Sequence, residues 1–236
     1  DRYQKTVNCP DKKPAHGNHG DFFQWAYFHY GRFSFSTPAW QIPDVELKTD
    51  SANADSRFTT EEKFIRWAEQ NAIQNYFVDW QVIDHPDFPD KTVEVGGIKP
   101  FLLKNPPLRI VDSLAGQQTE FFLQLLGMKP EIEMVNIKTE EIGNDLFRLS
   151  LDIHNKGILP TCTQIGTKMR WVRKMRLDLQ LSNRQNLVSG QKTVILPRLN
   201  GGEHTSAQWI VKGKGKITIQ TGAPNTGFIQ KQIELK

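Results

Sequence analysis

Two histidines stand at a spacing that metal sites use. His16 and His19 form an H-x-x-H pair in a stretch that also contains Gly17 and Gly20. On a helix such a pair can bind zinc, but the glycines disfavour a helix and no third ligand accompanies the pair. A polar turn is therefore the expected structure. No H-x-x-E pair occurs in the 236 residues.

The remaining chemistry-bearing residues match no nucleophile or phosphate motif. The chain has only two cysteines, Cys9 and Cys162, which are too few and too far apart for a disulfide scaffold or a zinc knuckle. No Gly-rich phosphate loop, G-x-S-x-G elbow or dinucleotide fingerprint is present. These patterns give no support for nucleotide or serine-hydrolase chemistry.

A basic run surrounds Trp171 and is the best candidate for nucleic-acid binding. If 169–181 is a strand, most of its cations share one face and Trp171 lies on the other. Sheets that bind RNA need aromatic side chains on the same face as the cations, so we expect no nucleic-acid partner. A charge-protected edge strand or a docking surface for the acidic half of the chain is the expected role. The run consists of Lys168, Arg170, Arg173, Lys174 and Arg176.

Charge and length divide the chain into two parts. Residues 1–127 carry 13 Lys and Arg against 17 Asp and Glu, a net charge of −4. Residues 128–236 carry 17 against 9, a net charge of +8. With 38% hydrophobic residues the chain can bury a sizeable core, and no run of eighteen apolar residues exists that could form a membrane-spanning helix. We therefore expect no membrane partner.

Residues 1–127 have the pattern of an α/β fold. The aromatic stretch 22–46 predicts a buried helix followed by a buried strand near 33–40. Thr59 and Glu62 have capping-box spacing, which predicts a helix from Thr59 to about Asn75. An amphipathic helix is predicted over 108–126, with Gly127 as its C-terminal cap. We place the domain boundary at Gly127.

Residues 128–236 have the period-two pattern of strands. Phe147, Leu149, Leu151 and Ile153 alternate with polar residues, which predicts a strand with one wet face. The other strands are expected at 131–137, 169–181, 192–196, 206–211, 216–220 and 228–235. Seven short strands without a helix predict an immunoglobulin-like β-sandwich over 128–236.

The segment Gly20–Trp40, GDFFQWAYFHYGRFSFSTPAW, resembles the late part of the catalytic domain in zinc carboxypeptidases of the carboxypeptidase A type. The ordered series WAY, YG and SFST carries this resemblance. The later phrases DHP at 84–86, VEVGG at 93–97 and KNPP at 104–107 look like the tail of bacterial members that carry an extra β-sandwich. The resemblance covers 1–127 by motif, and 128–236 by pattern and by NKGILPT at 155–161.

The resemblance implies that the chain is the C-terminal segment of a secreted or periplasmic metallocarboxypeptidase-like protein. Residues 1–127 would be the last portion of the catalytic domain, with part of its sheet and helices. The family binds one zinc ion through ligands upstream of the WAY helix, so the full-length protein would hold zinc and hydrolyse peptides. We expect this segment to hold no cofactor and to be inactive by itself.

The resemblance fails at the general base. Aligning Thr37 with the Thr of the family's T-x-E pattern places Ala39 where the catalytic glutamate belongs. Alanine carries no proton, so another carboxylate must replace it or the full-length protein only binds its ligand. Glu94, in VEVGG, is the candidate substitute. The competing interpretation of Glu94 is a carboxylate that accepts backbone amides in a Gly-Gly turn.

Two further residues match substrate-binding positions of the family. Tyr3 corresponds to the mobile tyrosine that closes over the substrate carboxylate, although an ordinary terminal tyrosine fits as well. Phe23 occupies the position that lines the side-chain pocket, where it would favour apolar or aromatic C-terminal residues. A core phenylalanine is the alternative.

The competing hypothesis is a non-catalytic protein that binds peptide or glycan through the aromatic region 22–40 and the sandwich. In either case, aromatic residues such as Trp25, Phe28 and Phe33 would lack partners in a partial sheet. We therefore expect the chain to bind the missing N-terminal part of the same protein, to form a homo-oligomer or to have a rearranged structure.

Overall fold

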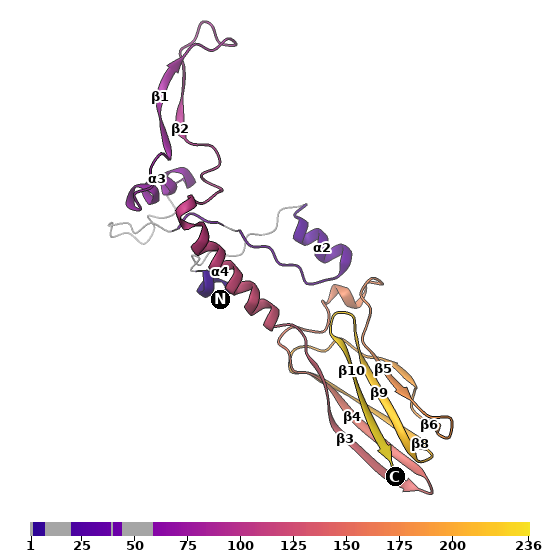
Figure 1. The fold of residues 1–236 in the computed structure, drawn as a ribbon. Helices are drawn as coiled ribbons and strands as arrows, with labels where there is room; N and C mark the ends of the chain where they lie inside the picture. The colour runs from indigo at the N-terminus through magenta and orange to yellow at the C-terminus, as the bar shows by residue number, and fades with distance from the viewer. Residues whose placement is uncertain (1, 8–19, 39, 44–58) are drawn as a thin grey trace. The chain divides into compact units, whose positions relative to one another are not determined.

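A computed structural model describes residues 2–7, 20–38, 40–43 and 59–236 (Figure 1). The chain divides into two compact units. The first consists of Asp1–Ala15 and Thr37–Leu123, and the second of His16–Ser36 and Gln124–Lys236. The boundary placed at Gly127 stays a prediction, while the aromatic stretch that ends at Ser36 is grouped with the C-terminal sheets. In the described residues, no helix has the length and apolar character needed to cross a membrane.

The first unit has a small core around α3. Its elements are α1 (Arg2–Val7), α3 (Thr60–Gln70), β1 (Phe77–Ile83), β2 (Val93–Ile98) and most of α4 (Leu108–Gly127), whose last residues, 124–127, belong to the second unit. The capping box is confirmed: the Thr59 hydroxyl accepts from the Glu62 amide, and the Glu62 carboxylate accepts from the Thr59 amide at 2.8 Å. The helix ends at Gln70, earlier than predicted, because Ala72 and Asn75 adopt positive φ. The buried core consists of Trp40, Phe64, Trp67 and Ala68.

Much apolar surface of the first unit is uncovered. Helix α4 has its predicted bounds within one residue, but it has no buried residue. Ile110 and Leu114 pack partly against the core, whereas Phe122 and Leu123 are exposed, so the expectation that the apolar residues of this helix face a core is wrong along much of its length. Strands β1 and β2 form only an antiparallel pair. Among the described residues of 33–40, none forms a strand.

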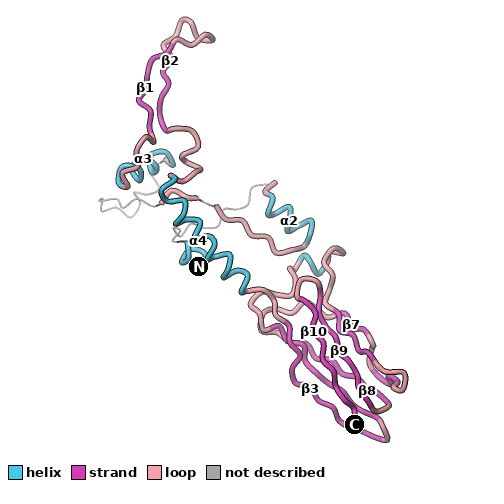
Figure 2. The backbone as a smooth tube through the Cα atoms, viewed as in Figure 1, coloured by secondary structure: helices cyan, strands magenta, loops and turns pink. Residues whose placement is uncertain are grey.

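The second unit contains two four-stranded antiparallel sheets (Figure 2). One has the strand order β3-β4-β8-β6 and the other β10-β9-β5-β7. Their bounds are β3 Ile132–Gly143, β4 Leu146–Asn155, β5 Arg176–Gln180, β6 Asn186–Ser189, β7 Thr193–Ile195, β8 His204–Lys212, β9 Gly215–Ala223 and β10 Gly227–Leu235. Eight strands therefore replace the seven that were predicted, and β6 is the addition.

The inner faces of the two sheets share one hydrophobic core. Along β4 the predicted alternation is confirmed, with Phe147, Leu149, Leu151 and Ile153 buried. The same core contains buried residues of β5, β8 and β9, including Leu177, Trp209 and Ile219. Burying one face of each sheet in this way gives the all-β sandwich part of the chain.

A buried amide fixes the loops at one end of this core. Asn155 is fully buried at the end of β4. Its Oδ1 accepts from the backbone amides of Glu131 (3.1 Å) and Gly157 (3.2 Å). Its Nδ2 donates to the carbonyls of Leu159 (3.0 Å) and Asn200 (3.1 Å). The side chain therefore satisfies backbone groups of three separate segments, as a buried polar group must.

The aromatic helix α2 (Phe22–Tyr30) is attached to the second unit through its C-terminal end. The left-handed cap Gly31 lies against the short 3-10 helix η2 (Ile165–Thr167), where a Cβ would come within 2.9 Å of the Gly166 Cα. Thr163 donates its hydroxyl to the Gly31 carbonyl at 2.7 Å and accepts from the Gly166 amide at 2.9 Å. No residue of α2 is buried, so the predicted buried helix is helical but not buried.

We expect Asn155→Ala to destabilise the sandwich by about 3 kcal/mol or more, since it leaves several buried backbone groups without partners. Urea unfolding followed by circular dichroism measures the change. The matched control is Asn183→Ala at an exposed turn, which should alter the unfolding free energy by no more than about 0.5 kcal/mol. Equal effects of the two substitutions would contradict the role given to Asn155.

We expect Thr163→Val to loosen α2 without unfolding the sheets. Valine keeps the shape of the side chain but loses both buried hydrogen bonds, at a cost of about 1–2 kcal/mol. Hydrogen exchange of the amides in 22–31 should accelerate about tenfold, since 1.4 kcal/mol corresponds to that factor. The control is Thr167→Val, whose hydroxyl bonds only to the nearby Gln164 carbonyl. Unchanged exchange in Thr163→Val would show that other contacts hold α2.

Candidate functional site

Tyr3 lies beside the Thr-Pro pair that precedes position 39. Its hydroxyl shares a hydrogen bond with the Thr37 hydroxyl and donates to the Pro38 carbonyl at 3.3 Å. The Gln118 amide donates to the same hydroxyl at 3.2 Å, and the Tyr3 ring meets Phe121 edge-on at 4.9 Å. The structure therefore brings Tyr3 next to the T-x-E-like pattern. These contacts also give the ring a packing role against α4.

Glu94 lies on a strand instead of in a turn. It is an exposed residue of β2 and is paired in register with Val82 of β1. The two glycines that follow, Gly96 and Gly97, belong to the same strand, and a Cβ at Gly96 would come within 2.7 Å of the Trp80 Cα. The close approach of Trp80 explains the need for glycine there. The partners of the Tyr3 hydroxyl do not include Glu94.

Phe23 lies on α2 and is half-buried, in a different unit from Tyr3 and Glu94. Around it lies an exposed set of rings that we call the α2 aromatic surface. Trp25 is at its centre, stacked on Phe22 at 5.6 Å and on His29 at 5.1 Å. The exposed rings are Phe22 (76%), Trp25 (42%), Phe28 (54%), Tyr30 (51%), Phe33 (38%) and Phe35 (53%).

Several sequence candidates lie outside the described residues. These are Ala39, His16, His19 and Cys9. Within the part of the chain that the structure describes, no group of three His, Cys, Asp or Glu side chains could hold a metal ion. The described residues therefore do not fit the zinc ion that the resemblance implies.

The basic segment is a loop and not a strand. Residues 168–175 form turns after η2, and β5 begins only at Arg176. The argument from alternating strand faces therefore does not apply to Trp171. Its ring is 60% exposed, and the Arg170 guanidinium lies 4.7 Å from the ring centre. Cations and an aromatic ring are neighbours here, which the strand prediction had ruled out.

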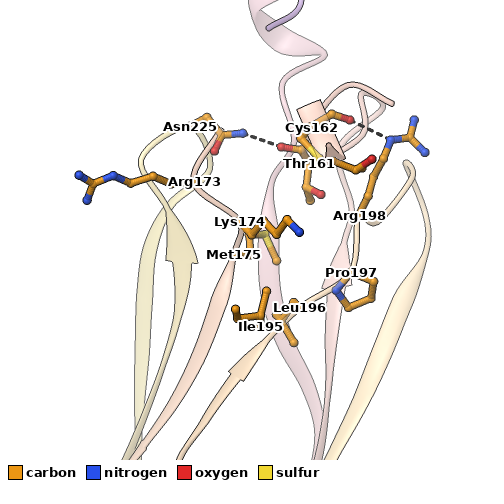
Figure 3. A pocket seen from close by; sticks show the side chains of 11 residues that line it. Thr161, Cys162, Arg173, Lys174, Met175, Ile195, Leu196, Pro197, Arg198 and Asn225 are labelled. Carbon is orange, nitrogen blue, oxygen red and sulfur yellow. Dashed lines mark hydrogen bonds between the residues drawn. The ribbon is translucent and has the colours of Figure 1, made fainter. Parts of the chain in front are cut away.

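A pocket of about 320 Å³ opens beside this loop (Figure 3). It is lined by Thr161, Cys162, Thr167, Arg173, Lys174, Met175, Ile195, Leu196, Pro197, Arg198 and Asn225. Asn225 donates its amide to the Thr161 carbonyl, and the Arg198 Nε donates to the Cys162 carbonyl at 2.8 Å. In Figure 3 the Arg173 side chain extends away from the other labelled side chains.

The thiol in this pocket is not set up as a nucleophile. Burial raises the pKa of Cys162, and this effect outweighs the opposing influence of the Arg198 and Lys174 charges. A reactive cysteine needs a lowered pKa so that thiolate is present at neutral pH. Binding is therefore the chemistry that this pocket can perform, with Lys174 and Arg198 as its charged groups.

Sequence reasoning missed this pocket because its lining comes from three separate loops. The only local signal was the run of cations at 168–176. Nothing in the sequence indicated that Pro197, Arg198 and Asn225 would lie beside that run.

The comparisons with known proteins give one family match, which lies in the second unit. A family described as a domain of unknown function, DUF8731, matches residues 131–234. No curated protein matches the chain. Solved structures with similarity include alpha-2-macroglobulin from Escherichia coli, spanning domain MG7 to the C-terminus, with 21% identity and a TM-score of 0.29 over 47% of this chain and 17% of that one. A β-glucosidase from Streptomyces venezuelae has 12% identity and a TM-score of 0.24 over 45% of this chain and 15% of that one. The chain thus spans less than a fifth of either protein.

Proposed function

We propose that the chain is the C-terminal segment of a zinc metallocarboxypeptidase-like protein and that it is inactive by itself. In this proposal residues 1–127 complete a catalytic domain whose metal ligands lie upstream, and 128–236 form an appended immunoglobulin-like sandwich. The zinc ion, the peptide substrate and a secreted or periplasmic location all follow from the family resemblance of 20–40.

One observation carries the proposal: α2 is apolar on every side, yet it has no buried residue. A helix of this kind is normally enclosed by other parts of a large core. Contiguous exposed aromatic surface marks a contact with another polypeptide. The α2 aromatic surface includes the WAY motif, and in a partial carboxypeptidase-like domain these rings would lack their usual partners. The upstream part of the same protein is therefore the partner that we propose for it.

The position of Tyr3 supports the same proposal. Its hydroxyl lies against Thr37 and Pro38, directly before the position where the family has its catalytic glutamate. A tyrosine at this place can donate a hydrogen bond to a substrate carboxylate once its present partners are displaced. In the proposal Phe23 lines the pocket for the substrate's C-terminal side chain and favours apolar residues.

We expect the α2 aromatic surface to become protected in a protein that includes the upstream sequence. Amides of 22–36 should exchange more slowly there than in the 236-residue chain alone, because the rings pack against the upstream sheet. The longer protein should contain one zinc ion and hydrolyse peptides ending in Phe faster than peptides ending in Arg. The control segment is 216–222 of β9, whose exchange should not change. Absence of an H-x-x-E pair upstream, or equal exchange at 22–36, would contradict the proposal.

In the same longer protein, Glu94→Gln tests the substitute base. If the Glu94 carboxylate takes the proton of the attacking water, the substitution should lower kcat by about 100-fold or more with little change in KM. The control is Asp79→Asn, which removes an exposed carboxylate from the neighbouring strand β1. An unchanged kcat in Glu94→Gln would show that Glu94 has no catalytic role. An equal loss of activity in both variants would show that the substitutions disturb the fold of the β1–β2 hairpin, and not that Glu94 is the base.

A further inference from the structure

A second hollow adjoins the pocket of Figure 3 on the other side of the basic loop. It has a volume of about 750 Å³, within the usual range of ligand pockets, ~300–1,000 Å³. The two hollows share Thr167, Arg173, Lys174 and Ile195. We call the two together the basic groove. It lies wholly within the second unit.

The basic groove has a large surplus of positive charge. Asp178 is the only carboxylate among the residues that line it. Arg176 already pairs with Asp178 at 2.9 Å, and Thr193 donates to the same carboxylate at 2.7 Å. Burial acts to raise the pKa of Asp178, but these two hydrogen bonds outweigh it and hold the pKa below its usual value. Asp178 thus stays ionised, and its carboxylate oxygens already accept hydrogen bonds from Arg176 and Thr193.

The other cations of the loop have no carboxylate partner among the residues that the structure describes. Within the described residues no acidic group forms an ion pair with Lys168, Arg170, Arg173 or Lys174. Four positive charges within seven residues repel one another, and a concave site strengthens the field that they produce. An anionic ligand would relieve this repulsion.

The uncharged side chains in and beside the groove indicate which class of anionic ligand fits it. Phe228 lines the larger hollow and is 61% exposed. Trp171 is not one of the lining residues, but its exposed ring lies against Arg170, which lines that hollow. Flat rings of this kind pack against the C–H faces of sugar rings. Thr167 and Gln220 add a hydroxyl and an amide that can bond to sugar hydroxyls. The groove thus combines charge, rings and neutral hydrogen-bonding groups.

We propose that the basic groove binds an acidic oligosaccharide, with Lys174 and Arg173 contacting its sulfate or carboxylate groups and Phe228 packing on a sugar ring. Single-stranded nucleic acid fits less well, because its binding sites run cations along an extended track. Here the cations without an ion pair among the described residues are Arg198 and the four of the loop 168–174, which surround two adjoining hollows and follow no extended track. The proposal does not depend on the carboxypeptidase-like function, since every residue of the groove lies in the second unit.

The test measures binding of a fluorescently labelled heparin-derived hexasaccharide to the 236-residue chain by fluorescence anisotropy. Lys174→Gln and Arg173→Gln should each weaken binding by about five- to tenfold, the effect of losing one charge-assisted contact. The matched control is Lys212→Gln, which removes one exposed charge at the end of β8. It should change the affinity less than about twofold, as expected for an exposed charge that contacts no ligand. Thermal unfolding verifies that each variant is folded.

Competition separates the oligosaccharide from other anions. Free sulfate, an oligo-dT decamer and an octa-glutamate peptide compete with the labelled probe, and all three should compete more weakly than unlabelled hexasaccharide. Phe228→Ala should weaken binding of the hexasaccharide about threefold or more, the value of a lost ring contact, and leave sulfate competition unchanged. Equal losses of affinity for the hexasaccharide in Lys174→Gln and Lys212→Gln would overturn the proposal in favour of nonspecific electrostatic attraction. Stronger competition by the decamer or the peptide would overturn it in favour of that ligand class.

Discussion

The hydrogen bonds of the Asn155 side chain hold together the end of the sandwich on which the candidate sites depend. A buried amide has to satisfy two acceptor and two donor positions, and here backbone groups of Glu131, Gly157, Leu159 and Asn200 supply the partners. Thr161 continues this arrangement, since its hydroxyl accepts from the Leu199 amide at 3.1 Å. The loops fixed in this way carry Arg198, η2 and the attachment of α2. Binding residues at this end are thus placed by buried hydrogen bonds and not by sheet pairing.

The two units differ in how completely they bury their apolar side chains. In the sandwich, alternating residues of both sheets enclose a core that contains Leu149, Leu177 and Trp209. In the first unit the buried cluster around α3 has four residues, Val7 is also buried, and α4 presents Phe122 and Leu123 to solvent. Burial of apolar surface is the main favourable term in folding. The first unit is therefore the part of the described chain with most to gain from a partner.

Local signals in the sequence predicted the elements that depend on local chemistry. The Thr59–Glu62 capping box and the alternation along 147–153 were read correctly because each interaction spans few residues. The loop 168–175 was predicted as a strand because Met169, Trp171 and Met175 share one parity, although pairing begins only at Arg176. Burial of α2 was also wrong, since helical periodicity does not reveal whether a covering surface exists. The pocket required the loops at 161–167, 195–198 and 223–226 to meet, and no local pattern encodes that.

The bond between Thr163 and Gly31 joins residues that are 132 positions apart. Because synthesis proceeds at ~5–20 residues per second, α2 leaves the ribosome roughly 7 to 26 s before its anchoring threonine is made. For that time the aromatic rings of 22–35 have no attachment to the sandwich and are available to chaperones or to other nascent chains. The order of synthesis therefore leaves α2 without its anchor during translation, and a slower ribosome over the residues between them lengthens this interval.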